Sequence, residues 1–219
     1  MIKIKQQDKI AVLGTSGCGK TTLMNYIVDN VIDRFPNVVV IDLVGNFSKN
    51  REIRKVGKVP CKNPRPSKAC LRILNEDQLD ETMKTLIDVP EPLFIVLDEV
   101  DVFVKPQKML PEMYLYTQVG RNWDKGGMFA VRQVGRLNKN ILSNSHYLIL
   151  FKLYNKSDID YLDTILSVGI GRRGLGTKDL LSVLDDYEFW LIDLHHSKPL
   201  GVYRLDEKTN RLVGIPKKI

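Results

Sequence analysis

Residues 14–21 read Gly-Thr-Ser-Gly-Cys-Gly-Lys-Thr, a full match to the phosphate-binding P-loop pattern G-x-x-x-x-G-K-[ST]. Glycine adopts backbone dihedral angles that other residues avoid, so such a loop can turn its N–H groups inward around an anion. The residues predicted to contact the phosphates are Gly14, Thr15, Ser16, Gly17, Cys18, Gly19, Lys20, Thr21 and Thr22. Within this set, Lys20 faces the β- and γ-phosphates and the Thr21 hydroxyl is a ligand for Mg²⁺.

The flanking sequence meets the test for a genuine P-loop, which needs a strand before it and a helix after it. Residues 9–13 are a short apolar run of the buried-strand type. Residues 21–30 place apolar side chains at helical spacing. The alternative, a glycine-rich turn that only resembles a P-loop, explains neither flank.

Strands and helices alternate along the rest of the chain. Strands are predicted over residues 38–44, 93–97, 128–133, 146–151, 188–194 and 201–204. Helices are predicted after the Asn75 cap up to Pro90, over about 109–122, over 158–166 with Ser157 as cap, and over 178–184. This order predicts an α/β fold, a three-layer P-loop NTPase of the RecA-like (ASCE) type with a mainly parallel central sheet. We expect one domain over residues 1–219, with a basic insertion at about 45–74 and a C-terminal extension at about 168–219.

The composition is that of an ordinary globular protein, with 43% hydrophobic and 27% charged residues among 219. The sequence contains neither an apolar run of 18 residues nor a signal peptide, so we expect an intracellular protein without a membrane span. Cys61 and Cys70 lack the spacing of a zinc site, and with Cys18 they are interpreted as free thiols.

The net charge is +7, from 33 basic and 26 acidic residues, and the excess is clustered. Residues 49–72 contain one acidic residue, Glu52. They contain nine basic residues: Lys49, Arg51, Arg54, Lys55, Lys58, Lys62, Arg65, Lys68 and Arg72. Such a cluster is typical of a nucleic-acid contact, and its prolines predict a loop over much of the stretch. We assign the contact to Lys49, Arg51, Arg54, Lys55 and Lys58 and expect them to line a DNA channel. The alternative is a solvated insertion without a partner.

An acidic pair supplies the second half of a phosphoryl-transfer site. Asp98 and Glu99 directly follow the apolar strand at 93–97, and ligands of open α/β sheets bind at the carboxyl ends of strands. We expect Asp98 to hold Mg²⁺ and Glu99 to take a proton from the attacking water. An acidic base favours an ATPase over a GTPase, which orients water with glutamine. The alternative is a surface acidic pair that ends the strand.

The order of these parts resembles the FtsK/HerA superfamily of DNA-pumping ATPases. The resemblance is carried by the P-loop, Phe-Ile-Val-Leu-Asp-Glu at 94–99, Val-Gly-Arg-Asn at 119–122 and Gly-Gly-Met-Phe-Ala-Val-Arg-Gln at 126–133. The small size is similar to that of genome-packaging ATPases from membrane-containing icosahedral viruses, including archaeal ones. The resemblance implies a homo-oligomeric ring, expected to be a hexamer, that threads double-stranded DNA. It also implies capsid or internal-membrane proteins as partners at a packaging vertex, and a location in the host cytoplasm or virion.

The resemblance also assigns two catalytic roles. Gln133, at the end of a strand, is expected to sense the γ-phosphate, although it could be an ordinary strand-end amide. Arg121 is the candidate for an arginine finger supplied to a neighbouring subunit. The residues alone leave Arg132, Arg136, Arg172 and Arg173 open as well. The family has a small hydroxyl residue before the sensor glutamine, whereas this chain has an arginine at 132.

Other functions remain open from the sequence. A conjugative or plasmid-transfer ATPase would share these motifs and differ in its genomic neighbours. A nucleotide-gated assembly protein would bind ATP without pumping, and DNA would not stimulate its hydrolysis. A small-molecule kinase could place Arg172 and Arg173 in a lid, but the Asp98-Glu99 pair argues against it.

Overall fold

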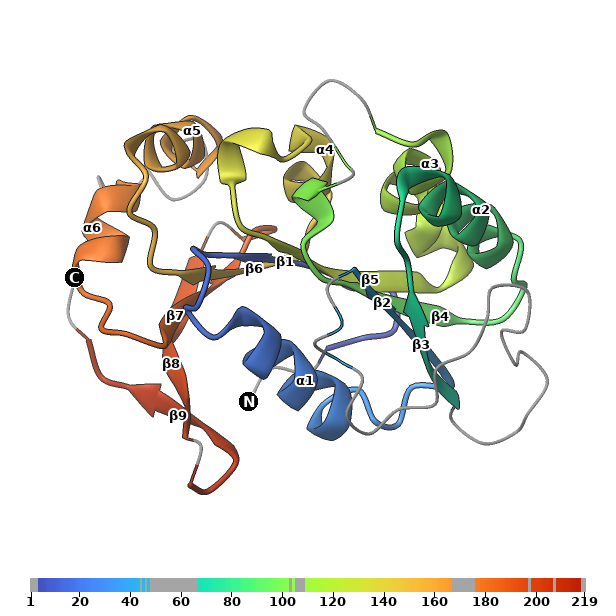
Figure 1. Cartoon of the computed structure of the whole chain (residues 1–219). Coiled ribbons are helices and arrows are strands. Elements are labelled where there is room, and N and C mark those ends of the chain that lie inside the picture. The colour runs from blue at the N-terminus through green and yellow to red at the C-terminus, as the bar shows by residue number, and fades with distance from the viewer. Residues whose placement is uncertain are drawn as a thin grey trace.

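A nine-stranded sheet forms the centre of the molecule in our computed structural model (Figure 1). The model describes residues 4–43, 45, 47, 67–102, 104, 109–166, 176–196, 198–206 and 208–217. The strands are β1 (Lys9–Leu13), β2 (Asn37–Asp42), β3 (Ser67–Arg72), β4 (Leu93–Leu97), β5 (Lys125–Val131), β6 (Tyr147–Phe151), β7 (Glu188–Asp193), β8 (Lys198–Asp206) and β9 (Arg211–Ile215). Their order across the sheet is β3-β2-β4-β5-β1-β6-β7-β8-β9.

The sheet has a parallel and an antiparallel half. All pairs from β3 to β6 are parallel, and β7, β8 and β9 add to β6 as antiparallel strands. The P-loop strand β1 lies between β5 and β6 and therefore in the interior of the sheet. The predicted α/β fold with a mainly parallel sheet is confirmed.

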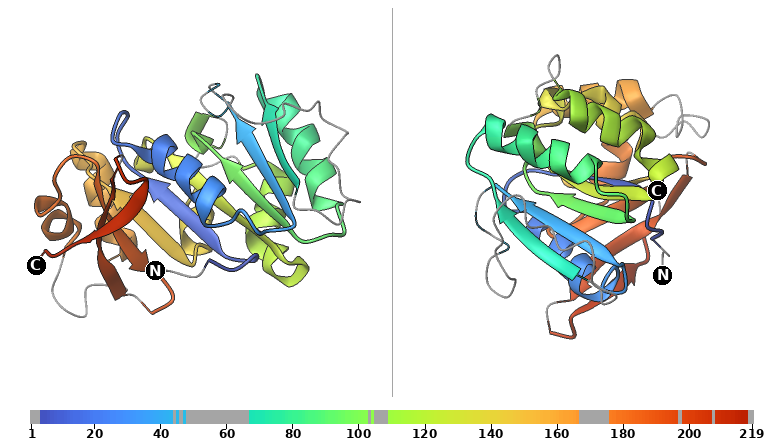
Figure 2. Two further views of the ribbon diagram at one scale, coloured as in Figure 1. Left: turned by 90° about the horizontal axis from the view of Figure 1, so that it is seen from below. Right: turned by 90° about the vertical axis from the view of Figure 1, so that its right-hand side faces the viewer.

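Helices cover both faces of the sheet and make three layers. The helices are α1 (Lys20–Asn30), α2 (Glu76–Ile87), α3 (Pro111–Val119), α4 (Lys139–Ser143), α5 (Lys156–Leu166) and α6 (Thr177–Ser182), with short 3₁₀ turns η1 (Val100–Val102), η2 (Gly120–Trp123) and η3 (Val134–Arg136). Helix α1 lies on one face, and α2 to α6 lie on the other (Figures 1 and 2).

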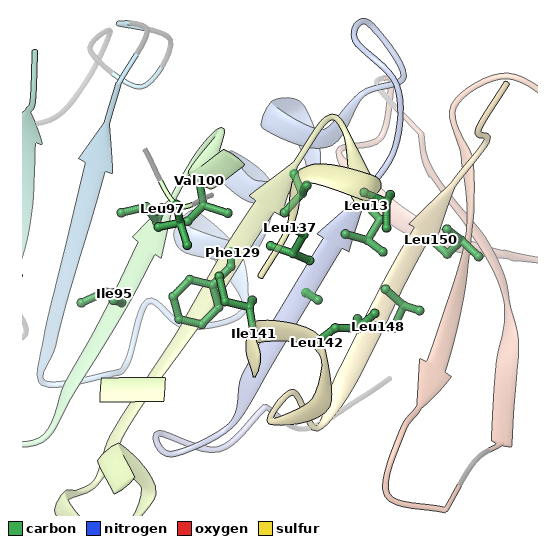
Figure 3. Packing of buried hydrophobic residues seen from close by; sticks show 14 of the residues in the cluster. Leu13, Ile95, Leu97, Val100, Phe129, Leu137, Ile141, Leu142, Leu148 and Leu150 are labelled. Atoms are coloured by element: carbon green, nitrogen blue, oxygen red, sulfur yellow. The ribbon is translucent and has the colours of Figure 1, made fainter. Parts of the chain in front are cut away.

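The central strands are apolar on both sides because both faces are covered. Every residue of β1, β4 and β5 is buried. Phe129 of β5 contributes a fully buried ring to the core on the side of α2 to α6, where Leu97, Ile141 and Leu148 also lie (Figure 3). This packing fixes the ends of β1, β4 and β5, from which the candidate site is built.

Several predicted boundaries were wrong. The end of the basic segment, predicted as loop, is the edge strand β3, and β9 was not predicted at all. Helix α5 begins at Lys156, so Ser157 lies inside it; the Asn155 side chain accepts a hydrogen bond from the Ser157 N–H at 3.1 Å and provides the cap. The Asn75 cap of α2 is as predicted, with the Gln78 N–H donating to its side chain.

Strand β5 starts three residues earlier than predicted, at Lys125. Residues 125–127, which the predicted strand left out, are therefore buried strand. Lys125 is only 2% exposed. Its amine donates hydrogen bonds to the carbonyl of Leu86, at 3.1 Å, and to that of Val89. A cation at the carboxyl end of α2 thus contacts a carbonyl of the last helical turn, where acceptors lack a partner within the helix, and a carbonyl just beyond it.

In the described stretches of the chain, each helix is too short or too polar to cross a bilayer. Lys49, Arg51, Arg54, Lys55 and Lys58 lie outside the described residues, as do Arg172 and Arg173. Their assigned roles remain predictions.

Candidate active site

The P-loop connects the carboxyl end of β1 to the first turn of α1. Gly19 is the N-cap of α1 with φ 98°, in the left-handed region that favours glycine. Gly14 is required for another reason: a Cβ there would lie 2.6 Å from Cys18 Sγ and 2.7 Å from Phe151 Cβ. The loop thus packs closely on β6 and ends at a helix N-terminus, where backbone N–H groups and the helix dipole favour anions.

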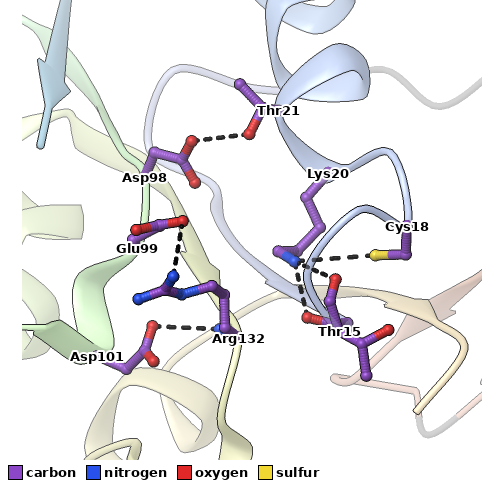
Figure 4. A network of polar contacts seen from close by, with 9 residues as sticks. Thr15, Cys18, Lys20, Thr21, Asp98, Glu99, Asp101 and Arg132 are labelled. Carbon is purple, nitrogen blue, oxygen red and sulfur yellow. Dashed lines mark hydrogen bonds and ion pairs between the residues drawn. The ribbon is translucent and has the colours of Figure 1, made fainter. Parts of the chain in front are cut away.

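Lys20 is anchored within the loop that precedes it. It is 6% exposed, and its Nζ donates to the carbonyl oxygens of Gly14 and Thr15, both at 2.7 Å (Figure 4). Ser16, Gly17 and Thr22 line the same pocket. Six of the nine residues that the motif predicted therefore line one pocket: Ser16, Gly17, Gly19, Lys20, Thr21 and Thr22.

Asp98 joins the two motifs, although 77 positions separate it from Thr21. The Thr21 hydroxyl donates to Asp98 Oδ2 at 2.8 Å. The carboxylate is 1% exposed, and Oδ1 has no hydrogen-bond partner among the described residues. Burial raises the pKa of Asp98, against the opposing effects of the Thr21 hydrogen bond and the Lys20 charge. A hydroxyl beside a buried carboxylate with a spare oxygen provides the hard oxygen donors that Mg²⁺ takes.

Glu99 lies next to Asp98 and is paired with Arg132. The Glu99 Oε1 is 3.3 Å from Arg132 Nη1, and Asp101 Oδ1 accepts a hydrogen bond from the Arg132 N–H at 3.1 Å. Glu99 has φ 54°, an uncommon value for a residue with a side chain. Burial raises the pKa of Glu99, and the nearby Arg132 charge opposes that rise. The arginine that departs from the family pattern therefore contacts the predicted base.

The structure does not bring Gln133 and Arg121 into this pocket. Gln133 follows Arg132 but is exposed and does not line the pocket. Arg121 is exposed in η2, before β5, and so lies at the opposite end of the parallel strands from the P-loop. Burial of Lys9, together with the nearby Arg121 charge, lowers the pKa of Lys9 to about 8. Within one chain, Arg121 is therefore remote from the site, and its role as a finger for a neighbouring subunit remains a prediction.

The pocket has a volume of about 610 Å³ and two different walls. We call Asp98, Glu99 and Arg132 the carboxylate wall. We call the residues contributed by the turn before β7, by β8 and by the following turn the C-terminal wall: Tyr187, Arg204, Asp206 and Lys208. The C-terminal wall is not predictable from the sequence, because no motif marks it. Its one local signal is a tyrosine in a turn position that favours glycine or asparagine.

Comparison with known proteins supports the order of these parts. Residues 5–105, which contain the P-loop, Asp98 and Glu99, match the family described as helicase HerA, central domain. The expected resemblance to the FtsK/HerA type is confirmed. No curated protein sequence matches the chain.

Solved structures show a likeness in fold over most of the chain. The genome packaging NTPase B204 from Sulfolobus turreted icosahedral virus 2, in complex with ATPγS, superposes with a TM-score of 0.73 at 14% identity, covering 91% of this chain and 98% of that one. The pCW3 conjugation coupling protein TcpA superposes with a TM-score of 0.60 at 11% identity, covering 94% of this chain and 63% of that one. The N-terminal domain of zonular occludens toxin from Neisseria meningitidis superposes with a TM-score of 0.50 at 15% identity, covering 92% of this chain and 96% of that one. At these identities the likeness establishes a P-loop NTPase fold.

Proposed function

We propose that the protein is an ATPase that couples ATP hydrolysis to the movement of double-stranded DNA, and that it packages a viral genome into a capsid. The observation that carries the proposal is the Thr21–Asp98 hydrogen bond beside Glu99, which joins both halves of a phosphoryl-transfer site. The likeness to a packaging NTPase and to a conjugation coupling protein supports DNA as the cargo.

Each residue of the site has a chemical role in this proposal. The P-loop N–H groups and Lys20 bind the phosphates and hold them in line with the attacking water. Glu99, at the edge of the bound phosphates, accepts the proton of that water. The Thr21 hydroxyl and the Asp98 carboxylate would hold Mg²⁺. When bound, Mg²⁺ neutralises charge that develops on the phosphoryl oxygens.

The trans role of Arg121 can be tested by mixing two inactive variants. Lys20→Ala disables a site, and Arg121→Ala disables the finger given to a neighbour. In a mixed ring, an intact site can receive a finger from a Lys20→Ala subunit, so mixing should restore ATPase activity. Lys20→Ala mixed with Glu99→Gln is the matched control and should stay inactive, because both changes lie in the same site. If the mixture of Lys20→Ala and Arg121→Ala is also inactive, Arg121 is not the arginine finger.

DNA contact is proposed for the basic residues outside the described part of the chain. Alanine at Lys49, Arg51, Arg54, Lys55 and Lys58 should weaken DNA binding and reduce the slope of affinity against salt concentration. The control removes charge elsewhere, with Lys156→Ala and Lys178→Ala on α5 and α6. Unchanged DNA affinity in the first variant removes the assignment.

An ATPase assay with and without double-stranded DNA, combined with sizing at high protein concentration, tests the proposed function as a whole. We expect stimulation by DNA together with a ring, expected to be a hexamer. A nucleotide-gated assembly protein would show no stimulation. A conjugative ATPase would be stimulated too, and transfer genes rather than capsid genes beside its own would identify it.

A further inference from the structure

The strand order determines which way a bound nucleotide is oriented in the pocket. The carboxylate wall comes from β4 and β5, on one side of β1, whereas the C-terminal wall comes from the antiparallel half on the other side (Figure 1). Since Glu99 must meet water at the γ-phosphate, a bound nucleoside triphosphate directs its triphosphate tail toward β4 and β5. Its nucleoside must then lie toward the C-terminal wall.

A strained turn on that wall carries an aromatic side chain. Asp185 to Glu188 form a β-turn in which the Glu188 N–H donates to the Asp185 carbonyl at 3.2 Å. Tyr187 occupies the third position of this turn with φ 63°. Glycine or asparagine is favoured there, because a bulky side chain with positive φ is strained. Strain of this kind is retained mainly where a side chain has a function to perform.

The turn is fixed by polar contacts around it. The Glu188 side chain is almost fully buried, and its Oε2 accepts a hydrogen bond from the Asp185 N–H at 2.9 Å. Lys217 Nζ lies 2.7 Å from Asp185 Oδ2 and 3.1 Å from Glu188 Oε2. The backbone of Tyr187 is therefore held in one conformation before any ligand arrives.

The Tyr187 ring lies beside the P-loop and remains open to the pocket. A Cβ on Gly19 would be 3.4 Å from Tyr187 Cδ1, yet Tyr187 is 60% exposed. The neighbouring rings of Phe151 and Phe189, with centroids 5.0 Å apart, are buried and support the wall from within. An exposed ring on a rigid turn offers a flat surface on which a base can stack.

We infer that Tyr187 is the stacking platform for the base of the bound nucleotide. This inference rests on the proposed function, because it assigns the nucleoside half of the same pocket. The strain at Tyr187 is retained because the turn orients the ring toward the nucleoside. Lys217 and Glu188 stabilise that orientation.

Calorimetric titration with ATP and with inorganic tripolyphosphate, each with Mg²⁺, tests the inference on the full chain. Tyr187→Ala should weaken ATP binding by roughly 5- to 150-fold, the range of a lost base–aromatic stack. Tripolyphosphate has no base, so its affinity should not change. Tyr187→Phe should bind ATP as the wild type does. Tyr114→Ala, which removes a 47% exposed tyrosine from α3 outside the pocket, is the matched control and should change neither affinity.

A further variant separates strain from stacking. Tyr187→Asn suits the positive φ but has no ring, so it should melt at the same or a higher temperature than the wild type and still lose ATP affinity. Unchanged ATP binding by Tyr187→Ala overturns the inference, and so does an equal loss for ATP and tripolyphosphate. A wild-type chain that binds neither ligand would instead contradict the proposed function, and the inference with it.

Discussion

The two walls of the pocket are built in different ways. In the carboxylate wall, Asp98 is buried against Thr21, and Glu99 is paired with Arg132, so each group is placed by the ends of packed parallel strands. In the C-terminal wall, Tyr187 stands exposed on a strained turn of the antiparallel half. The difference separates two requirements: chemistry needs buried groups with shifted pKa values, whereas holding a nucleoside needs an open, rigid surface.

The largest expected effect comes from Glu99, the proposed base on the carboxylate wall. Glu99→Gln should reduce ATP turnover by about 100- to 10,000-fold, the usual contribution of a general base, and should leave ATP binding intact. Steady-state hydrolysis and nucleotide titration measure the two quantities. Glu81→Gln, an exposed glutamate on α2, is the control. Normal turnover in Glu99→Gln would exclude it as the base.

The proposed Mg²⁺ site on the same wall should give the next largest effect. Asp98→Asn should raise the Mg²⁺ concentration needed for half-maximal activity by roughly 10- to 100-fold, as expected for a carboxylate that holds the ion directly or through water. In EDTA the variant should bind ATP at least as tightly as the wild type, because Asp98 then has no ion to hold and a carboxylate repels the phosphates. An unchanged Mg²⁺ requirement would remove Asp98 from the site.

The Glu99–Arg132 pair predicts a pH effect with a definite sign. Glu99 acts as a base only when ionised, and burial raises its pKa while Arg132 opposes that rise. Activity should therefore fall as the pH drops through the raised pKa. Arg132→Gln removes the opposing charge, so the acid limb of the kcat–pH profile should move to higher pH. Arg132→Lys keeps the charge and should move it less. Coincident profiles for wild type and Arg132→Gln would mean that the pair does not tune the base.

The smallest effect is expected behind the C-terminal wall. Lys217→Ala removes the cation that links Asp185 and Glu188, so the turn should loosen and ATP affinity should fall by less than in Tyr187→Ala. Turnover at saturating ATP should not change, because Lys217 is remote from the carboxylate wall. A turnover defect as large as that of Glu99→Gln would show that the two walls are not separate.

The two walls also differ in how well the sequence predicts them. The P-loop, Asp98 and Glu99 were predictable because a local motif and a strand-end position place them, and the structure brings them together. Tyr187 was not, because antiparallel pairing from β6 to β8 brings it to the loop and its turn conformation contradicts the usual preference. Strand β3 was missed for a third reason: its Lys68 and Arg72 continue a basic, proline-rich segment, which obscured an edge strand.

The position of Arg121 has a consequence for symmetry. If it completes a neighbour's pocket, each chain offers its finger at one end of the parallel strands and receives one at the other. Two copies related by a twofold axis can exchange fingers only if the finger and the pocket lie on one shared patch, where each copy completes the other's site. A head-to-tail contact instead repeats until it closes as a cycle or continues as a filament. In either arrangement a single chain lacks its finger, so the ATP turnover of each chain should rise with protein concentration.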